Sequence, residues 1–302
     1  MSTSYHVAVI GLGAMGMGAA RSCLRAGLTT YGIDLSEQAR SQLQQAGAAA
    51  VMADARPLAE TLDAVLLLVV NAAQVRRILF GEEGLARHLK PGTAIMVSST
   101  IAAEEASSLA AELAQLGLLM LDAPVSGGAI KADAGEMTVM AAGADAAFDK
   151  LAPVLDAVAG KLYRVGSEPG QGSTVKIIHQ LLAGVHIAVA AEAMALASRA
   201  GVPLDLMYDV VTHAAGNSWM FENRMPRVLT GDYQARSAVD IFVKDLTLVA
   251  DTAKALRFPL PLASTALNMF LSASNAGHGQ EDDSAVIKTF SGITLPGQEE
   301  RP

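Results

Sequence analysis

The chain has 302 residues, 51% hydrophobic and only 4% aromatic, a length and composition that favour two domains with a sizeable core. Its formal net charge is −8, with acidic and basic residues interspersed, which argues against a nucleic-acid-binding surface. The single cysteine, Cys23, excludes an intrachain disulfide, and we expect it to be a small buried hydrophobic residue.

The N-terminus and one long apolar segment bear on cellular location. Polar residues 1–4 lead directly into an apolar run, so we expect no signal peptide and a cytoplasmic protein. Residues 181–197 are mostly apolar, but His186 and Glu192 lie among them. Because a charge there is costly in lipid, we interpret the segment as a buried helix of a soluble protein, not as a membrane span.

Short apolar β runs alternate with helical patterns through the first half of the chain. This alternation predicts right-handed βαβ units and a parallel sheet. Two later β runs on either side of a helix are expected to extend the sheet edge, and the first of them is a candidate for antiparallel pairing. The predicted strands are 6–10, 29–33, 64–69, 94–97, 118–121, 137–142 and 161–165, and the predicted helices are 14–25, 36–46, 72–79, 103–116 and 145–158.

The pattern changes at the glycine-rich segment 166–172. Beyond it we find no convincing strand, and prolines mark the helix boundaries. The predicted fold class is therefore α/β, with an N-terminal Rossmann doubly wound parallel sheet (1–167) and an all-helical C-terminal domain (168–302) for substrate binding and oligomerisation. We expect disorder after Gly292. The predicted helices of this second part are 173–200, 204–213, 238–256 and 262–275.

The first thirty-four residues carry a dinucleotide-binding fingerprint. An apolar strand leads into a glycine loop that opens a helix, and the next strand ends at Asp34. Asp34 would accept hydrogen bonds from the adenosine ribose and repel a 2′-phosphate, so the sequence predicts NAD as the cofactor. The diphosphate would lie at the helix N-terminus. The predicted cofactor loop comprises Gly11, Leu12, Gly13, Ala14, Met15 and Gly16.

Two other predicted strands lead into loops with candidate cofactor residues. Val70 and Asn71 end one strand and could pass beside the adenine ribose and diphosphate, and Thr100 follows the next and could reach the nicotinamide ribose. Asn and Thr also cap helices, and the two roles are compatible.

A third loop, residues 122–128, contains Ser126, Gly127 and Gly128. Two successive glycines expose backbone N–H groups beside a hydroxyl, which suits a substrate carboxylate, although the string could equally be a plain turn.

Lys176 lies in the first turns of a strongly apolar helix, one turn before Gln180. A lysine there is usually solvated, but partial burial would lower its pKa toward the range useful for proton transfer. His179 could be a core histidine. No carboxylate stands at matching spacing to His179 and His186, so we expect no metal site.

Four blocks of the chain together resemble the β-hydroxyacid dehydrogenase family, and the resemblance covers residues 6 to about 287. The blocks are GLGAMG at 11–16, DAPVSGG at 122–128, GQGSTVK at 170–176 and KDL at 244–246. The resemblance implies that Ser126, Gly127 and Gly128 hold the substrate carboxylate and that Lys176 is the catalytic acid–base. It also implies that Thr100 lies on the nicotinamide side and that Lys244 is a second lysine of the cofactor site.

The chain departs from the family pattern after the catalytic lysine. Where the family has Asn-Asn or Asn-Gln amides that orient substrate, this chain has His179 and Gln180, which implies a different hydroxyl pattern on a small hydroxy-acid substrate. Residues 212–226 and 240–245 resemble a subgroup that oxidises four-carbon sugar acids such as L-threonate at C2. Trp219, in the first block, could equally be plain core.

Several alternatives remain open on the sequence alone. Within the enzyme class they are reduction of tartronate semialdehyde and oxidation of 3-hydroxyisobutyrate. Outside it the alternative is a non-catalytic NAD-binding interaction module, against which Lys176 and the Ser126 loop speak. Imine reduction is disfavoured for the same reason. The apolar segment 181–197 and the large helical domain suggest a homo-oligomer, because an exposed apolar surface of that size would be unusual in a monomer.

Overall fold

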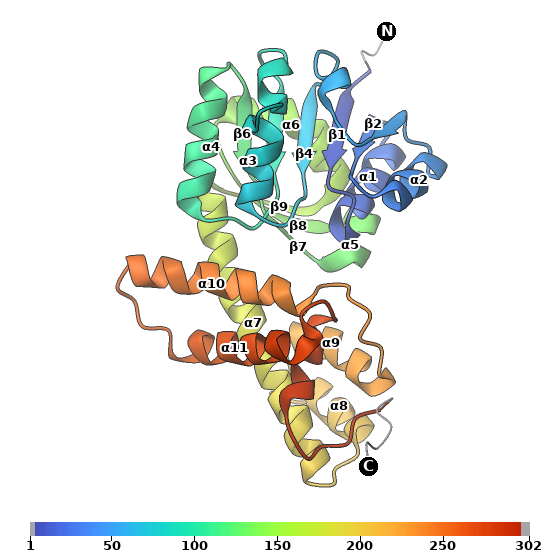
Figure 1. The fold of residues 1–302 in the computed structure, drawn as a ribbon, viewed down its shortest axis with the longest axis vertical. Helices are drawn as coiled ribbons and strands as arrows, with labels where there is room; N and C mark the ends of the chain where they lie inside the picture. The colour runs from blue at the N-terminus through green and yellow to red at the C-terminus, as the bar shows by residue number, and fades with distance from the viewer. Residues whose placement is uncertain (1–3, 297–302) are drawn as a thin grey trace. The chain divides into compact units, whose positions relative to one another are not determined.

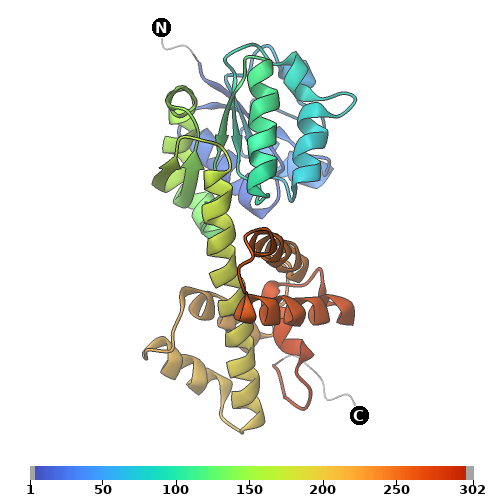
Figure 2. The ribbon, with the colours of Figure 1, turned by 90° about the vertical axis from the view of Figure 1, so that its left-hand side faces the viewer.

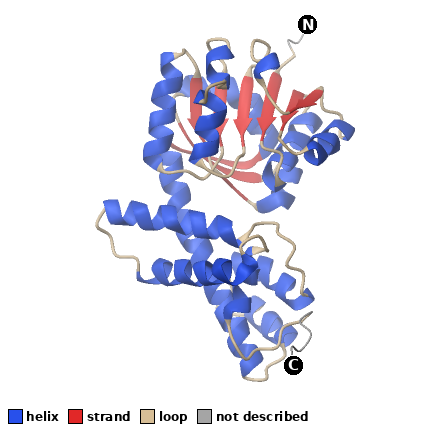
Figure 3. Cartoon of the chain, in the orientation of Figure 1, coloured by secondary structure: helices blue, strands red, loops and turns tan. Residues whose placement is uncertain are grey.

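The computed structural model describes residues 4–296, and the chain divides into two compact units, residues 1–176 and 177–302. Every named strand lies in the first unit, and the second is helical over its described residues (Figure 3). Helix α7 (Gln171–Arg199) is continuous across the division (Figure 2). The structural division falls within this helix. The boundary between a cofactor domain and a substrate domain after residue 167 stays a prediction.

The sheet of the first unit has the doubly wound order β3-β2-β1-β4-β5-β6, followed by β8 and β7, with β9 paired to β8. The first six strands are parallel, whereas β8 is antiparallel to β6 and β7 and parallel to β9. The strands are β1 (His6–Ile10), β2 (Thr29–Ile33), β3 (Ala50–Met52), β4 (Ala64–Leu67), β5 (Ala94–Val97), β6 (Leu119–Asp122), β7 (Val125–Ser126), β8 (Met137–Ala142) and β9 (Ala159–Gly166).

Helices cover both faces of this sheet because its strands are apolar on both sides. In β1, Val7 and Val9 pack into the layer with α1 and α6, and Ala8 and Ile10 pack into the layer with α3 and α4 (Figure 1). The parallel order brings the carboxyl ends of β1, β4, β5 and β6 to one edge. The helices are α1 (Ala14–Arg25), α2 (Glu37–Gln45), α3 (Ala72–Phe80), α4 (Ala103–Gln115), α5 (Gly128–Ala134) and α6 (Asp145–Val158).

The second unit packs its helices around the C-terminal part of α7. Ile187 and Met194 of α7 are fully buried with Phe242 and Phe270, whose rings stack with centroids 5.2 Å apart. The other helices are α8 (Leu204–Thr212), α9 (Trp219–Thr230), α10 (Val239–Ala255) and α11 (Pro261–Ala273), followed by a 3₁₀ segment at Asp283–Thr289.

The structure contains four elements that the sequence did not predict, and it settles the place of Trp219. Strands β3 and β7 and helices α5 and α9 were not predicted, since three of them are very short and α9 contains Pro226. Trp219 is half exposed, so it is not a core residue.

The tail after Gly292 is ordered as far as the structure describes it. Leu295 is buried and Thr294 is hydrogen-bonded to Ser198; residues 297–302 of the predicted disordered tail lie outside the described residues.

By length and composition alone, helix α7 could cross a membrane. Half of its most apolar 18-residue stretch is buried in the structure. The expectation of a buried helix therefore holds for one side only. The opposite side exposes a row of apolar residues at helical spacing. They are Val175, Ile178, Leu182, Val189 and Leu196.

Candidate active site

The glycine loop between β1 and α1 has the geometry that a dinucleotide needs. Gly11 has φ +90°, and a Cβ on Gly16 would lie only 1.7 Å from the Gly11 carbonyl oxygen, so α1 can pack this close only with glycine there. A Cβ on Gly13 would meet nothing within 4 Å, which leaves open space above the loop. The N–H groups of the first helical turn have no partner within α1 and face this side. These residues fit the diphosphate of NAD.

Asp34 lies at the end of β2, next to this loop. Its Oδ2 accepts the Leu12 N–H at 2.7 Å, and its Oδ1 accepts the Ser36 N–H at 2.7 Å. An ionised carboxylate has about four lone-pair positions, so two remain for ribose hydroxyls. Arg40 donates to the backbone carbonyls of Asp34 and Leu35, which places a cation at the backbone of the Asp34 turn.

The two neighbouring loops leave polar groups at the same sheet edge. Asn71 caps α3 by accepting the Gln74 N–H at 2.9 Å, and Val70 is exposed beside it. After β5, the hydroxyls of Ser98 and Ser99 are buried without a hydrogen-bond partner among the described residues. Buried hydroxyls normally have partners, so these two are an exception at this edge, next to Thr100.

The loop after β6 is shaped by its glycines. Gly127 has φ +135° and Gly128 has φ +72°, conformations that other residues rarely adopt. A Cβ on Gly128 would meet nothing within 4 Å, so the backbone there is approachable. Ser126 pairs with Thr138 of β8, which anchors the loop to the sheet.

Lys176 lies on α7 within the first unit and is only 6% exposed. The beginning of its helix is tied to the end of β6, because Asp122 accepts hydrogen bonds from Gly170 and Ser173. Lys176 therefore belongs to the same edge of the sheet as the cofactor loop and the Ser126 loop. Burial raises the pKa of Asp122, and the hydrogen bonds from Ser173 and Gly170 oppose that rise.

In the second unit, a buried polar network joins α7 to α10. Gln180 Nε2 donates to Asp245 Oδ2 at 2.6 Å, and Lys244 Nζ donates to Asp245 Oδ1 at 2.5 Å. His179 Nδ1 lies 3.0 Å from Gln180 Oε1. Since Oε1 can only accept, Nδ1 carries the proton in this contact. The network brings the predicted pair His179 and Gln180 together with Lys244, which lies 64 positions after Gln180 in the sequence.

Two carboxylates of this arrangement, Asp122 and Asp245, had no role assigned from the sequence. Both belong to blocks that carry the family resemblance. Asp122 stands between the apolar residues Leu121 and Ala123, a signal that could have indicated it, whereas Asp245 follows Lys244 and has no such signal. Within residues 4–296, no group of three His, Cys, Asp or Glu side chains could hold a metal ion.

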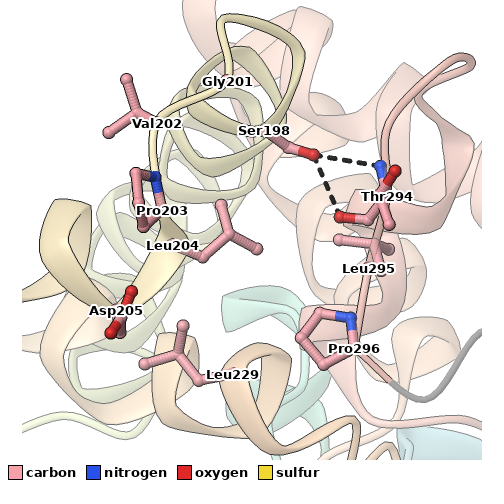
Figure 4. Close-up of a pocket in the computed structure, with 10 residues that line it drawn as sticks. All are labelled: Ser198, Gly201, Val202, Pro203, Leu204, Asp205, Leu229, Thr294, Leu295 and Pro296. Atoms are coloured by element: carbon pink, nitrogen blue, oxygen red, sulfur yellow. Dashed lines mark hydrogen bonds between the residues drawn. The ribbon is translucent and has the colours of Figure 1, made fainter.

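A pocket of about 580 Å³ lies elsewhere in the second unit (Figure 4). Leu204, Leu229 and Leu295 line it, with Asp205 as its charged group. Ser198 closes one side by bonding to the backbone of Thr294 (Figure 4). None of the predicted catalytic, cofactor or substrate residues lines this pocket, so we do not assign it to the active site.

The doubly wound sheet, the glycine loop and Asp34 define an NAD-binding oxidoreductase with a helical second unit. Residues 6–166 match the family model described as the NAD-binding domain of 6-phosphogluconate dehydrogenase. Residues 170–290 match the model described as NAD-binding of NADP-dependent 3-hydroxyisobutyrate dehydrogenase. The chain belongs to the β-hydroxyacid dehydrogenase family, and it is an NAD-dependent hydroxyacid dehydrogenase.

Individual relatives are similar over their whole length. L-threonate dehydrogenase of Escherichia coli K12 is 72% identical, over 98% of each chain, and that of Cupriavidus necator is 55% identical, over 98% of this chain and all of the relative. The crystal structure of 3-hydroxyisobutyrate dehydrogenase from Salmonella typhimurium matches with a TM-score of 0.92 and 70% identity, over 95% of this chain and all of that one. These matches confirm the predicted fold class and family.

Proposed function

We propose that this enzyme oxidises L-threonate at C2 to the 2-oxo acid, with NAD as the hydride acceptor. The observation that carries the proposal is 72% identity with an L-threonate dehydrogenase over 98% of both chains. The intact glycine loop, Ser126 loop and Lys176 at one sheet edge support it.

In this reaction, substrate binding and proton transfer are assigned to different residues. The Ser126 hydroxyl and the N–H groups of Gly127 and Gly128 hold the substrate carboxylate. Lys176, neutral before the step, takes the proton of the C2 hydroxyl as the hydride leaves C2, and in the reverse direction it returns that proton. NAD, when bound, supplies the hydride acceptor. The protein contributes orientation, which accounts for much of the barrier reduction.

The remaining predicted residues are assigned to binding. Gly11 to Gly16, Asp34, Val70, Asn71 and Thr100 hold NAD, together with Lys244. His179 and Gln180 orient the hydroxyls of the substrate beyond C2. The network through Asp245 supports this role because it holds the Gln180 amide and the Lys244 ammonium in fixed positions.

A substrate panel tests the proposal. NADH formation is measured with L-threonate, D-threonate, 3-hydroxyisobutyrate and L-serine, and NADH consumption with tartronate semialdehyde. We expect the highest kcat/KM with L-threonate. The 70% identical relative named 3-hydroxyisobutyrate dehydrogenase makes that acid the second candidate. A higher kcat/KM with 3-hydroxyisobutyrate or tartronate semialdehyde would refute the proposal. His179→Asn serves as the matched variant, with a loss expected for L-threonate only.

The choice of NAD over NADP depends on Asp34. We expect Asp34→Ser to lower kcat/KM for NAD by about 10- to 100-fold. This factor corresponds to the free energy of hydrogen bonds made by a charged group. The same change should raise kcat/KM for NADP, because the repulsion of the 2′-phosphate is lost while Arg40 remains nearby. Steady-state kinetics with both cofactors measure the effect. Glu37→Gln, which removes a neighbouring charge on α2, is the control and should preserve the preference for NAD.

We also propose a cytoplasmic homo-oligomer. The exposed apolar row on α7, which includes Leu182 and Val189, supports self-association because such surfaces are unusual in monomers. Sedimentation of the wild type and of Leu182→Glu tests this, and a monomeric wild type at micromolar concentration would exclude it.

A further inference from the structure

The carboxylate of Asp122 is fully buried at the end of β6 and holds the beginning of α7. Its Oδ2 accepts the backbone N–H groups of Gly170 and Ser173, both at 2.8 Å. Its Oδ1 accepts the Ser173 hydroxyl at 2.7 Å. One side chain thus satisfies two N–H groups at the start of α7, which would otherwise lack partners.

The glycines of the same segment let α7 lie directly against the sheet. A Cβ on Gly172 would lie 2.4 Å from the Asp122 carbonyl oxygen and 2.7 Å from that of Met140. Gly170 has φ +105°, and a Cβ there would meet the Ser107 hydroxyl at 2.6 Å. The helix start has no room to shift toward the sheet, and the three hydrogen bonds prevent it from moving away.

Lys176 follows Ser173 by three residues, so the two lie on neighbouring positions of one helix face. The side chain of lysine is long and flexible, and its nitrogen is placed only as well as the backbone that carries it. A misplacement of about 1 Å can cost about 100-fold in rate. A fixed helix start is therefore a requirement for a lysine that must meet one hydroxyl proton.

We propose that Asp122 is a positioning residue for the reaction: by holding the start of α7 against β6, it sets the place of Lys176. The inference rests on the proposed acid–base role of Lys176. Asp122 acts through hydrogen-bond geometry and exchanges no proton with the substrate.

Three variants test the proposal, with rates expressed per NAD-binding site determined by titration. Asp122→Ala removes all three contacts, and we expect kcat to fall by about 10- to 100-fold with the affinity for NAD unchanged. Asp122→Asn can keep the contacts, because its Oδ1 can accept both N–H groups while its amide donates to the Ser173 hydroxyl. We expect the asparagine variant to retain most of kcat. Ser107→Ala, which loses only a bond to the Pro169 carbonyl, should behave as wild type.

The outcomes separate the possibilities. A normal kcat for Asp122→Ala overturns the proposal, as does an equal loss for Asp122→Asn, which would show that charge rather than geometry matters. If the alanine variant does not fold, Ser173→Ala, which removes one contact, should lower kcat a few-fold without changing KM, and an unchanged kcat overturns the proposal. Lys176→Ala is measured in the same assay. If Lys176→Ala stays active, the acid–base role of Lys176 is refuted. If Lys176→Ala is inactive and Asp122→Ala has a normal kcat, only the positioning role of Asp122 is refuted.

Discussion

Replacing Lys176 with alanine is expected to lower kcat by about 10²- to 10⁴-fold, the contribution of a general acid–base residue. The affinity for NAD should remain near that of the wild type, because the glycine loop and Asp34, which are proposed to hold NAD, are unchanged in this variant. Steady-state kinetics with L-threonate and a fluorescence titration with NADH measure the two quantities.

Two controls sharpen this test. Lys176→Arg keeps the positive charge but cannot deprotonate, so it should be as inactive as the alanine variant if Lys176 acts as a base. Small primary amines in the assay should partly restore the turnover of Lys176→Ala. A variant with near-normal turnover, or an active arginine variant, would remove Lys176 from the acid–base role.

Replacing Arg224 with methionine is expected to lower the free energy of unfolding by about 3–5 kcal/mol, because it leaves a buried carboxylate without its partner. Arg224 Nε and Nη2 donate to the two oxygens of Asp283 at 2.7 and 2.9 Å, and Asp283 is fully buried. Unfolding in urea measures the loss. Arg236→Met breaks an exposed pair with Asp232 and should cost less than about 1 kcal/mol.

The loss should also depend on pH. Burial raises the pKa of Asp283, and the charge of Arg224 opposes that rise, so the methionine variant should have a still higher pKa. The native state then binds a proton more tightly than the unfolded state, and stability falls as pH rises from the unfolded value, about 4, through the native one. We expect a smaller loss at pH 5 than at pH 8. A double variant, Arg224→Met with Asp283→Leu, should recover much of the stability; an equal loss in the double variant would contradict the ion-pair explanation.

Local sequence patterns were enough to predict most strands and helices of the first unit. β1, β2 and β5 were predicted with their observed bounds, since each is a short run rich in apolar or β-branched residues. β7 was missed because two residues are too few to show an alternating pattern, and the strand exists only through its pairing with β8. Helix α9 was missed because Pro226 lies inside it, although Ser218 caps its start.

The candidate site was predictable where chemistry depends on backbone conformation. Gly11 and Gly16 are needed by the tight packing of this particular strand–turn–helix, whereas the roles of Ser126 and Lys176 are implied by the family resemblance and stay predictions. The same reasoning could not find the bonds of Asp122 and Asp245, because each joins residues about fifty or more positions apart.

By itself, the amino-acid sequence determined the fold class, the NAD fingerprint and the family, since these depend on local spacing, glycine conformation and apolar period. Only the tertiary structure decided which acids hold the helix of Lys176 and the amide of Gln180. It also decided that α7 buries one side and exposes the other. Burial and long-range hydrogen bonds are properties of packed elements, and no local pattern contains them.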